Sequence, residues 1–378
     1  MTEHRTPTLA PGELPAMDRS SRIPALRERF DELGIEALVV SELANVRYLT
    51  GFTGSSAVLL VRPEDAVFVT DGRYVTQSAQ QLGDAGVEAD IEISQEGPEV
   101  AAAAAATGIE RLGLEADSVS WSSQRRWSSE LYAGELVATS GAVEALRLAK
   151  QPEEIVRIRS ACAIADEALA ETAALLAEGP TERDFAIELE AAMMRRGADD
   201  LSFDTIVAAG PNGARPHHQP SGRPIAAGDL VVVDFGALVD GYHSDMTRTF
   251  AVDDVGDERQ RMLEVVARAQ RAGVETVRAG VAAADVDAAC REVIAEAGWA
   301  EAFLHGTGHG VGLDIHEEPR VSARSAATLQ PGQVVTVEPG VYLPELGGVR
   351  IEDTVVVTDE GCERLTLAPK DPSPRAGG

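Results

Sequence analysis

The sequence has few cysteines and no long apolar run, and each shortage excludes a class of protein. Cys162, Cys290 and Cys362 are too few and too scattered for a disulfide framework or a zinc knuckle. No run reaches the roughly 18 apolar residues that a membrane span needs. The N-terminal segment also lacks the apolar stretch of a secretory signal. We therefore expect a cytoplasmic protein without a membrane partner.

Positive charge is scarce as well. The chain has 33 lysines and arginines against 62 acidic residues, and its formal net charge is −29. Lys150 and Lys370 are the only lysines. This balance argues against nucleic acid as a partner, because phosphate binding needs clustered cationic side chains. It is compatible with an enzyme that binds metal or handles peptides, and a salt-adapted source is one interpretation of the acidic excess.

A length of 378 residues predicts two domains, since one hydrophobic core rarely organises so long a chain. Residues 21–148 alternate short apolar runs with helical patterns, which predicts an α/β domain. Pro152 begins a helix with acidic residues in its first turn, so the second domain is expected at 149–368. Residues 1–20 and 369–378 have no periodicity, and we expect both to be loose or disordered.

The second domain contains one order of elements twice: a long helix, a shorter helix and a hairpin. The helices are expected at residues 152–177, from 181, at 256–279 and near 285. Segments 179–197 and 280–298 align at an offset of 101 residues, and such internal similarity predicts a duplicated fold. The matched pairs are Gly179 with Gly280, Asp184 with Asp285 and Gly197 with Gly298. We predict an α+β domain built as a pseudo-twofold helix-helix-hairpin repeat.

Two acidic residues converge on each predicted hairpin. Asp234 interrupts an apolar strand, where a buried carboxylate is costly unless it is paired or binds a metal. A turn at Asp240–Gly241 would bring Asp245 opposite Asp234 to within about one residue. In the second hairpin, Glu338 and Glu352 flank a turn near residue 345 in the same way. Four neighbouring carboxylates would repel one another, and divalent cations would remove that repulsion.

Six of the seven histidines lie between residues 217 and 316. The glycine-rich stretch HGTGHGVGLDIHE carries His305, His309 and His316, and one of these should complete the metal shell. Such an oxygen-rich set favours Mn²⁺ first, with Co²⁺, Fe²⁺ or Zn²⁺ as alternatives. Five ligands suit two ions about 3.5–4 Å apart, a spacing that serves hydrolysis.

The motifs VDFG, SDMTRTF, HGTGHGVGLDIHE, VTVEPGVY and VRIEDT resemble the aminopeptidase P and prolidase group of the M24 "pita-bread" metallopeptidases. The N-terminal part, with SELANVRYLTGFTGSSAVLLV and DGRY, resembles the creatinase-type domain that accompanies that catalytic domain. The resemblance covers nearly the whole chain. It implies a creatinase-like α/β domain followed by an α+β pita-bread catalytic domain, and it implies a homodimer.

The resemblance also implies residue roles. The metal ligands would be Asp234, Asp245, His309, Glu338 and Glu352. The residues that bind the substrate carbonyl and stabilise the tetrahedral intermediate would be His217, His305 and His316. Arg350 would orient the carboxylates, and Glu338 would relay a proton to the leaving nitrogen.

The implied activity is that of a metallo-exopeptidase. A metal-bound hydroxide would attack the N-terminal Xaa-Pro bond of a dipeptide (prolidase) or of a longer peptide (aminopeptidase P), and the sequence leaves that choice open. Three alternatives remain: a methionine aminopeptidase, a metal-free creatinase-like amidinohydrolase, and a non-catalytic peptide-binding module of the same fold. His218, His243 and Asp353 are interpreted as structural or supporting residues.

Overall fold

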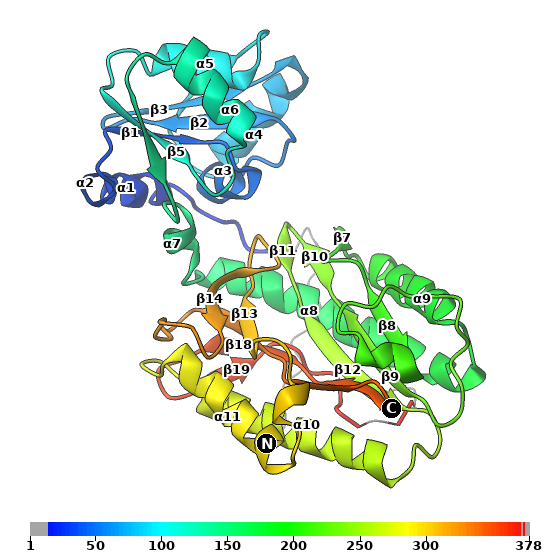
Figure 1. Cartoon of the computed structure of the whole chain (residues 1–378). Helices are drawn as coiled ribbons and strands as arrows, with labels where there is room; N and C mark the ends of the chain where they lie inside the picture. The colour runs from blue at the N-terminus through cyan, green and yellow to red at the C-terminus, as the bar shows by residue number, and fades with distance from the viewer. Residues whose placement is uncertain (1–13, 372, 375–378) are drawn as a thin grey trace. The chain divides into compact units, whose positions relative to one another are not determined.

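The computed structural model describes residues 14–371, 373 and 374, and the chain divides into two compact units (Figure 1). One unit is Ala16–Arg147. The other is the chain from Leu148 onward together with the segment that ends at Pro15. Within the described residues, no helix is long and apolar enough to cross a membrane.

The N-terminal unit is built around a six-stranded sheet with the strand order β4-β3-β2-β1-β5-β6. The strands are β1 Ala37–Val40, β2 Ala57–Val61, β3 Ala66–Thr70, β4 Asp90–Ile93, β5 Arg111–Glu115 and β6 Glu135–Thr139. The helices are α1 Arg22–Arg27, α2 Phe30–Leu33, α3 Leu43–Thr50, α4 Val75–Asp84, α5 Pro98–Ala105, α6 Trp121–Arg126 and α7 Glu144–Arg147. Every residue of β1, β2 and β3 is buried, as in a sheet covered on both faces. The predicted α/β class is confirmed.

The described parts of both chain ends are better anchored than their composition predicts. The Met17 side chain is only 5% exposed, and the Arg19 N–H donates to the Ala85 carbonyl at 2.9 Å. Near the other end, the Lys370 ammonium donates to the Gln270 side chain at 2.8 Å and to Asp353. Isolated contacts of this kind produce no periodic pattern in the sequence, so the sequence could not predict them. The same prediction for residues 1–13, 372 and 375–378 lies outside the described residues.

The second unit has four main helices and two principal sheets. The helices are α8 Pro152–Thr172, α9 Glu182–Arg195, α10 Asp257–Thr276 and α11 Ala283–Glu296. One sheet has the order β12-β9-β8, with β8 Ile206–Ala209, β9 Leu230–Phe235 and β12 Met246–Ala251. The other has the order β14-β13-β15-β18-β19, with β13 Gly308–Gly310, β14 Glu317–Val321, β15 Val334–Val337, β18 Asp353–Val357 and β19 Cys362–Arg364. Smaller pairings join β7 Asp200–Leu201, β10 Ala237–Val239 and β11 Tyr242–His243, and also β16 Gly340–Leu343 with β17 Gly347–Arg350.

The predicted duplication is visible in the backbone. Helix α8 packs on α9 and α10 packs on α11, and Figure 1 shows α10 and α11 side by side. The four matched glycines, at 179, 197, 280 and 298, all have φ between 75° and 93°, a region that glycine enters without strain. Isolated backbone bridges join Thr181 to Pro224 and Ala282 to Thr328, at corresponding places. Each half also has its own apolar core, so the pseudo-twofold α+β prediction is confirmed.

Candidate metal centre

The first hairpin brings two aspartates to one face of a sheet. Strands β9 and β12 pair with Asp234 opposite Thr247, and the chain turns at Asp240–Gly241, where φ is 45° and 74°. Asp245 therefore lies two residues from the position facing Asp234, one more than predicted. The two side chains still share a face, because strand residues alternate with a period of two.

The second hairpin confirms its predicted register. Val337 pairs with Asp353 in β15 and β18, and Gly340 pairs with Arg350 in β16 and β17. Both pairings share one register, so Glu338 and Glu352 lie directly opposite each other between them. The two hairpins also meet, since the Glu352 N–H donates to the Thr247 carbonyl at 3.1 Å.

These hairpins bring the carboxylates close enough to hold a cation. Asp234, Asp245 and Glu352 each offer an oxygen, and these atoms all lie within 4.8 Å of one another. Asp234 Oδ1 and Glu352 Oε1 are buried and accept no hydrogen bond from the described residues. Buried carboxylate oxygens without a donor are costly, and a bound cation removes that cost.

His309 completes the group from β13. Its Nε2 lies 3.5 Å from Asp245 Oδ2 and 3.4 Å from Glu338 Oε1. Its Nδ1–H donates to the Gly310 carbonyl at 2.9 Å, so the Nε2 lone pair faces the carboxylates. Burial lowers the pKa of His309 to about 4, which keeps the ring neutral and able to bind a metal. The structure thus brings all five predicted ligands together.

Glycine is required beside His309. A Cβ on Gly308 would lie 2.0 Å from the Thr336 carbonyl oxygen, and one on Gly310 would lie 2.3 Å from the Glu318 carbonyl oxygen. Real Cβ atoms do not approach backbone so closely. The histidine loop therefore passes close to its neighbours only because these positions have no side chain.

Burial and the closeness of the four acids raise the pKa values of three of them. Burial, reinforced by neighbouring carboxylates, raises the pKa of Asp245 and that of Glu352 well above the ordinary range. Burial also raises the pKa of Glu338 to about 8 against the opposing effect of Arg350. Such acids hold protons unless a divalent cation replaces them. The donor set, its orphaned oxygens and its electrostatics all fit a metal site.

Arg350 ties this acidic cluster to neutral groups around it. Its guanidinium donates to Asp234 Oδ2 at 2.6 Å, to Thr247 Oγ1 at 3.1 Å and to the Tyr342 hydroxyl at 2.7 Å. Thr247 in turn donates to Glu352 Oε2 at 2.8 Å. Thr247 and Tyr342 were not predicted from the sequence. The available signal was spacing, because Thr247 lies two residues after Asp245 on the same strand face.

A pocket of about 570 Å³ opens onto the cluster. The three predicted substrate histidines, His217, His305 and His316, all line it, together with the unpredicted Phe203 and Arg320. The His316 ring lies 4.4 Å from the His309 ring, centroid to centroid. This arrangement surrounds the metal-binding group with polar side chains that could contact a ligand.

Both ring nitrogens of His305 already make hydrogen bonds. Its Nδ1–H donates to the Gly306 carbonyl at 2.8 Å, and its Nε2 lies 2.8 Å from the Tyr342 hydroxyl. Burial lowers the pKa of His305 to about 4, so the ring is neutral and Nε2 accepts the tyrosine proton. A substrate carbonyl would have to displace Tyr342 to reach this ring.

The residues interpreted as supporting lie outside the pocket lining. His218 bonds to Glu182 at 2.9 Å, and His243 Nδ1 lies 2.9 Å from the Ser202 hydroxyl. Asp353 is completely buried and pairs with Arg248 at 3.0 Å. Their contacts are those of residues that hold segments together.

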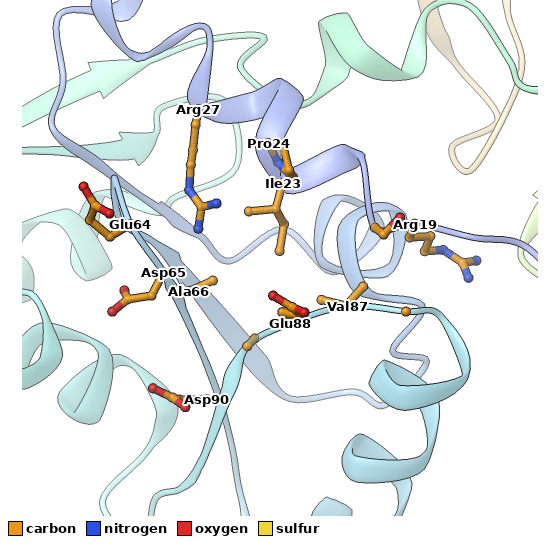
Figure 2. A pocket seen from close by; sticks show the side chains of 13 residues that line it. Arg19, Ile23, Pro24, Arg27, Glu64, Asp65, Ala66, Val87, Glu88 and Asp90 are labelled. Carbon is orange, nitrogen blue, oxygen red and sulfur yellow. The ribbon is translucent and has the colours of Figure 1, made fainter.

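The N-terminal unit has a hollow of its own, of about 600 Å³ (Figure 2). Glu64, Glu88 and Asp90 line it and are exposed to solvent. The Arg27 Nε donates to the Arg62 carbonyl at 2.7 Å. Exposed acids around an open hollow are ordinary on a surface with this net charge, so the hollow does not define a site.

Sequence and structure comparisons agree with this geometry. The model for the creatinase/prolidase N-terminal domain matches residues 22–149, and that for metallopeptidase family M24 matches residues 156–359. Fold and site together define a pita-bread metallopeptidase, and the chain belongs to metallopeptidase family M24. The predicted family and enzyme class are confirmed.

The relatives are similar over almost their whole length. An Xaa-Pro dipeptidase of Pyrococcus furiosus is 35% identical over 93% of this chain and 99% of its own. The structure of an Xaa-Pro dipeptidase from Bacillus anthracis is 41% identical, covers 93% of this chain and 98% of its own, and has a TM-score of 0.89. An X-Pro aminopeptidase from Thermotoga maritima is 34% identical, covers 90% of this chain and 98% of its own, and has a TM-score of 0.82.

Proposed function

We propose that the protein hydrolyses the N-terminal Xaa-Pro bond of dipeptides or short peptides, using two divalent metal ions. The observation that carries the proposal is the cluster of Asp234, Asp245 and Glu352, joined by His309 and Glu338, in which two buried carboxylate oxygens accept no hydrogen bond from the described residues. Asp234, Asp245, Glu338, Glu352 and His309 would hold the ions, with Mn²⁺ favoured by the oxygen-rich set. When bound, such ions polarise a carbonyl and make water more acidic.

Glu338 is proposed to carry the proton. It lines the pocket, so its carboxylate can reach a water molecule bound beside the acidic cluster. A group of this kind can accept a proton from attacking water and pass it to the leaving nitrogen. His217 and His316 are proposed to donate to the substrate carbonyl. His305, already bonded to Gly306 and Tyr342, would instead form the pocket wall.

The position of Arg320 supports a preference for dipeptide substrates over longer peptides. Arg320 and Arg350 are the cations among the described residues that line the pocket, and Arg350 is already paired with Asp234. Arg320 is exposed and is therefore available to a free carboxylate, which a dipeptide presents directly after its proline. Replacement of Arg320 by methionine should raise KM for Xaa-Pro dipeptides more than for longer Xaa-Pro peptides.

The test begins with protein purified without added metal and then reconstituted with Mn²⁺. We expect two ions per chain and hydrolysis of Xaa-Pro dipeptides only after reconstitution. Metal-independent turnover of an amidine substrate would instead identify a creatinase-like enzyme.

The role of Glu338 is tested by Glu338→Gln, which removes the proton acceptor and keeps the shape. We expect kcat to fall by about 10²-fold or more. Glu345→Gln is the matched control, because Glu345 is exposed in the nearby β16–β17 turn. Full turnover by Glu338→Gln with two ions bound would refute the proton role.

A further inference from the structure

The second helix of each repeat directs one buried carboxylate at the loop that carries the histidines of its half. Glu182 lies at the start of α9, and Asp287 lies near the start of α11. Both side chains are completely buried. A buried carboxylate must be satisfied by donors, and the identity of those donors indicates what each acid holds in place.

Glu182 binds both ends of one loop. Its Oε1 accepts from the Ala209 N–H at 2.8 Å and from the Asn212 amide at 2.9 Å. Its Oε2 accepts from the Ser221 N–H at 3.0 Å, from the Ser221 hydroxyl at 2.5 Å and from His218 Nε2 at 2.9 Å. Burial would raise the pKa of Glu182, but these hydrogen bonds lower it, so the carboxylate stays charged. One anion therefore closes the segment from 209 to 221.

His217 lies inside that closed segment. Its side chain is exposed, and within the described part of the chain its ring makes no hydrogen bond. Nothing on the ring itself fixes its position in the pocket. The backbone of its loop must do so, and His218, the next residue, is bonded to Glu182.

Asp287 does the same in the other half. Its Oδ1 accepts from the Thr307 N–H at 3.1 Å and from the Thr307 hydroxyl at 2.9 Å. Its Oδ2 accepts from Arg291 Nε at 2.7 Å, and Arg291 donates onward to the carbonyls of Phe303, at 3.2 Å, and His305. Thr307 lies midway between His305 and His309. The acid thus fixes the backbone just before the histidine of the metal centre.

We propose that Glu182 and Asp287 are positioning residues. Glu182 fixes the loop of His217, a substrate-contacting residue, whereas Asp287 fixes the loop of His309, a metal ligand. The inference rests on the proposed function only in assigning these two histidines different tasks. It follows that loss of Glu182 should impair turnover while sparing metal binding, and that loss of Asp287 should weaken metal binding itself.

The first experiment compares Glu182→Gln with Glu188→Gln, since Glu188 is an exposed acid on the same helix. We expect Glu182→Gln to lower kcat/KM by roughly 10- to 100-fold, because small displacements of a contacting group cost that much. Its metal content should equal that of Glu188→Gln. Amide hydrogen exchange between residues 210 and 221 should become faster.

A double-mutant cycle shows whether Glu182 acts through His217. In a His217→Ala background, Glu182→Gln should add little further loss of kcat/KM. An equal loss in both backgrounds, or no loss in the first, would overturn the positioning role. Ser221→Ala, which removes one donor and keeps the carboxylate, should show a smaller loss with the same dependence on His217. It replaces Glu182→Gln if that variant does not fold.

The second experiment compares Asp287→Asn with Asp285→Asn, an exposed position on the same helix. Calorimetric titration with Mn²⁺ should show an affinity about 10- to 100-fold weaker for Asp287→Asn, and nearly unchanged for Asp285→Asn and Glu182→Gln. Unchanged affinity for Asp287→Asn would refute its role. Neither titration nor amide exchange requires turnover, so a wild type without Xaa-Pro activity would refute the proposed function alone.

Discussion

Thr247 shows how one hydroxyl links the two halves of the centre. It accepts a hydrogen bond from Arg350 and donates to Glu352, and it is completely buried on the strand that follows Asp245. Arg350 also holds Asp234. Thr247 therefore connects Glu352 of the second hairpin with Arg350, which in turn binds Asp234 of the first hairpin.

Replacement of Thr247 by valine keeps the shape of the side chain and removes its hydroxyl. We expect the affinity for Mn²⁺, measured by calorimetric titration, to fall by roughly 10- to 100-fold, as is typical when a group that orients ligands is lost. The control is Thr249→Val on the same strand, since among the residues that the structure describes the Thr249 hydroxyl bonds only to the Arg350 backbone. Equal affinities in the two variants would contradict the proposed role of Thr247.

The raised pKa of Glu338 predicts how pH affects the metal-free protein. Its pKa is about 8 when folded against an ordinary value of 4.5, so the folded state binds more protons between these pH values. Stability should therefore fall as pH rises through this window. His309, with a folded pKa of about 4, affects only the range below its ordinary value of 6.5. The test is thus confined to pH 6.5–8.

We expect the melting temperature of the metal-free protein to fall across this range, by roughly 2–4 °C for each kcal/mol lost. Bound Mn²⁺ should remove most of the slope, because the cation replaces the protons. The metal-free Glu338→Gln variant should show a shallower slope than the metal-free wild type. A melting temperature that rises with pH in the metal-free wild type would contradict the prediction.

Sequence reasoning identified the charged residues of the centre and missed its neutral ones. Asp234 attracts notice because it interrupts an apolar strand. The glycine-rich stretch pointed to His305, His309 or His316 without choosing among them, and the family resemblance selected His309. Thr247 and Tyr342 are residue types common in any strand, so only the folded register shows their contacts. The two-residue offset of Asp245 follows from the predicted turn itself. A two-residue turn at Asp240–Gly241 pairs Asp234 with Thr247, and the same register holds in β9–β12 and in β10–β11.

At the scale of elements, the two short helices of the repeat differ at their first residues. Thr181 caps α9, its hydroxyl accepting from the Asp184 N–H at 3.1 Å, as the predicted start of this helix implied. Ala282 occupies the same place before α11 and has no side chain that could cap it. Its backbone is nevertheless extended, with φ −67° and ψ 134°, close to the −73° and 158° of Thr181.

Replacement of Ala282 by serine should therefore supply the missing cap. We expect a gain of about 0.5–1 kcal/mol in the free energy of unfolding, because serine is favoured over alanine at an N-cap, where its hydroxyl accepts from an N–H of the first turn. Urea denaturation of the metal-loaded protein measures the change. Thr181→Ala should lose a similar amount, and a loss of stability in Ala282→Ser would contradict the equivalence of the two positions.

The positions of helices and strands could be predicted where glycines or a periodic apolar pattern mark them in the sequence. Glycines 179, 197, 280 and 298 end or precede helices in both repeats, and their positive φ explains why the alignment of these positions held. Helix ends were less well predicted. The helix predicted to run to residue 177 ends at Thr172, and the chain continues as a 3₁₀ helix, Ala173–Glu178. The prediction placed the end too late because the alanine-rich sequence contains no stop signal before Gly179.

On the scale of the whole molecule, net charge is the dominant feature. A formal charge of −29 makes the folded state repel itself. Added salt screens this repulsion, since the Debye length falls to about 10 Å at 0.1 M. We expect the melting temperature of the metal-loaded protein at pH 8 to rise between 0.02 and ~0.5 M NaCl. The rise should shrink as the pH approaches the isoelectric point, about 4.6. A melting temperature that does not respond to salt at pH 8 would contradict the prediction.

The division of the four proposed metal-binding carboxylates between two hairpins has a consequence for ancestry. A chain that ended before α10 would keep Asp234 and Asp245 and would lack the acids of the second hairpin. Two such short chains could assemble four carboxylates only by facing each other across a symmetry axis. If two such chains were joined into one, the product would have the element order of the present protein, in which one half supplies aspartates and the other supplies glutamates.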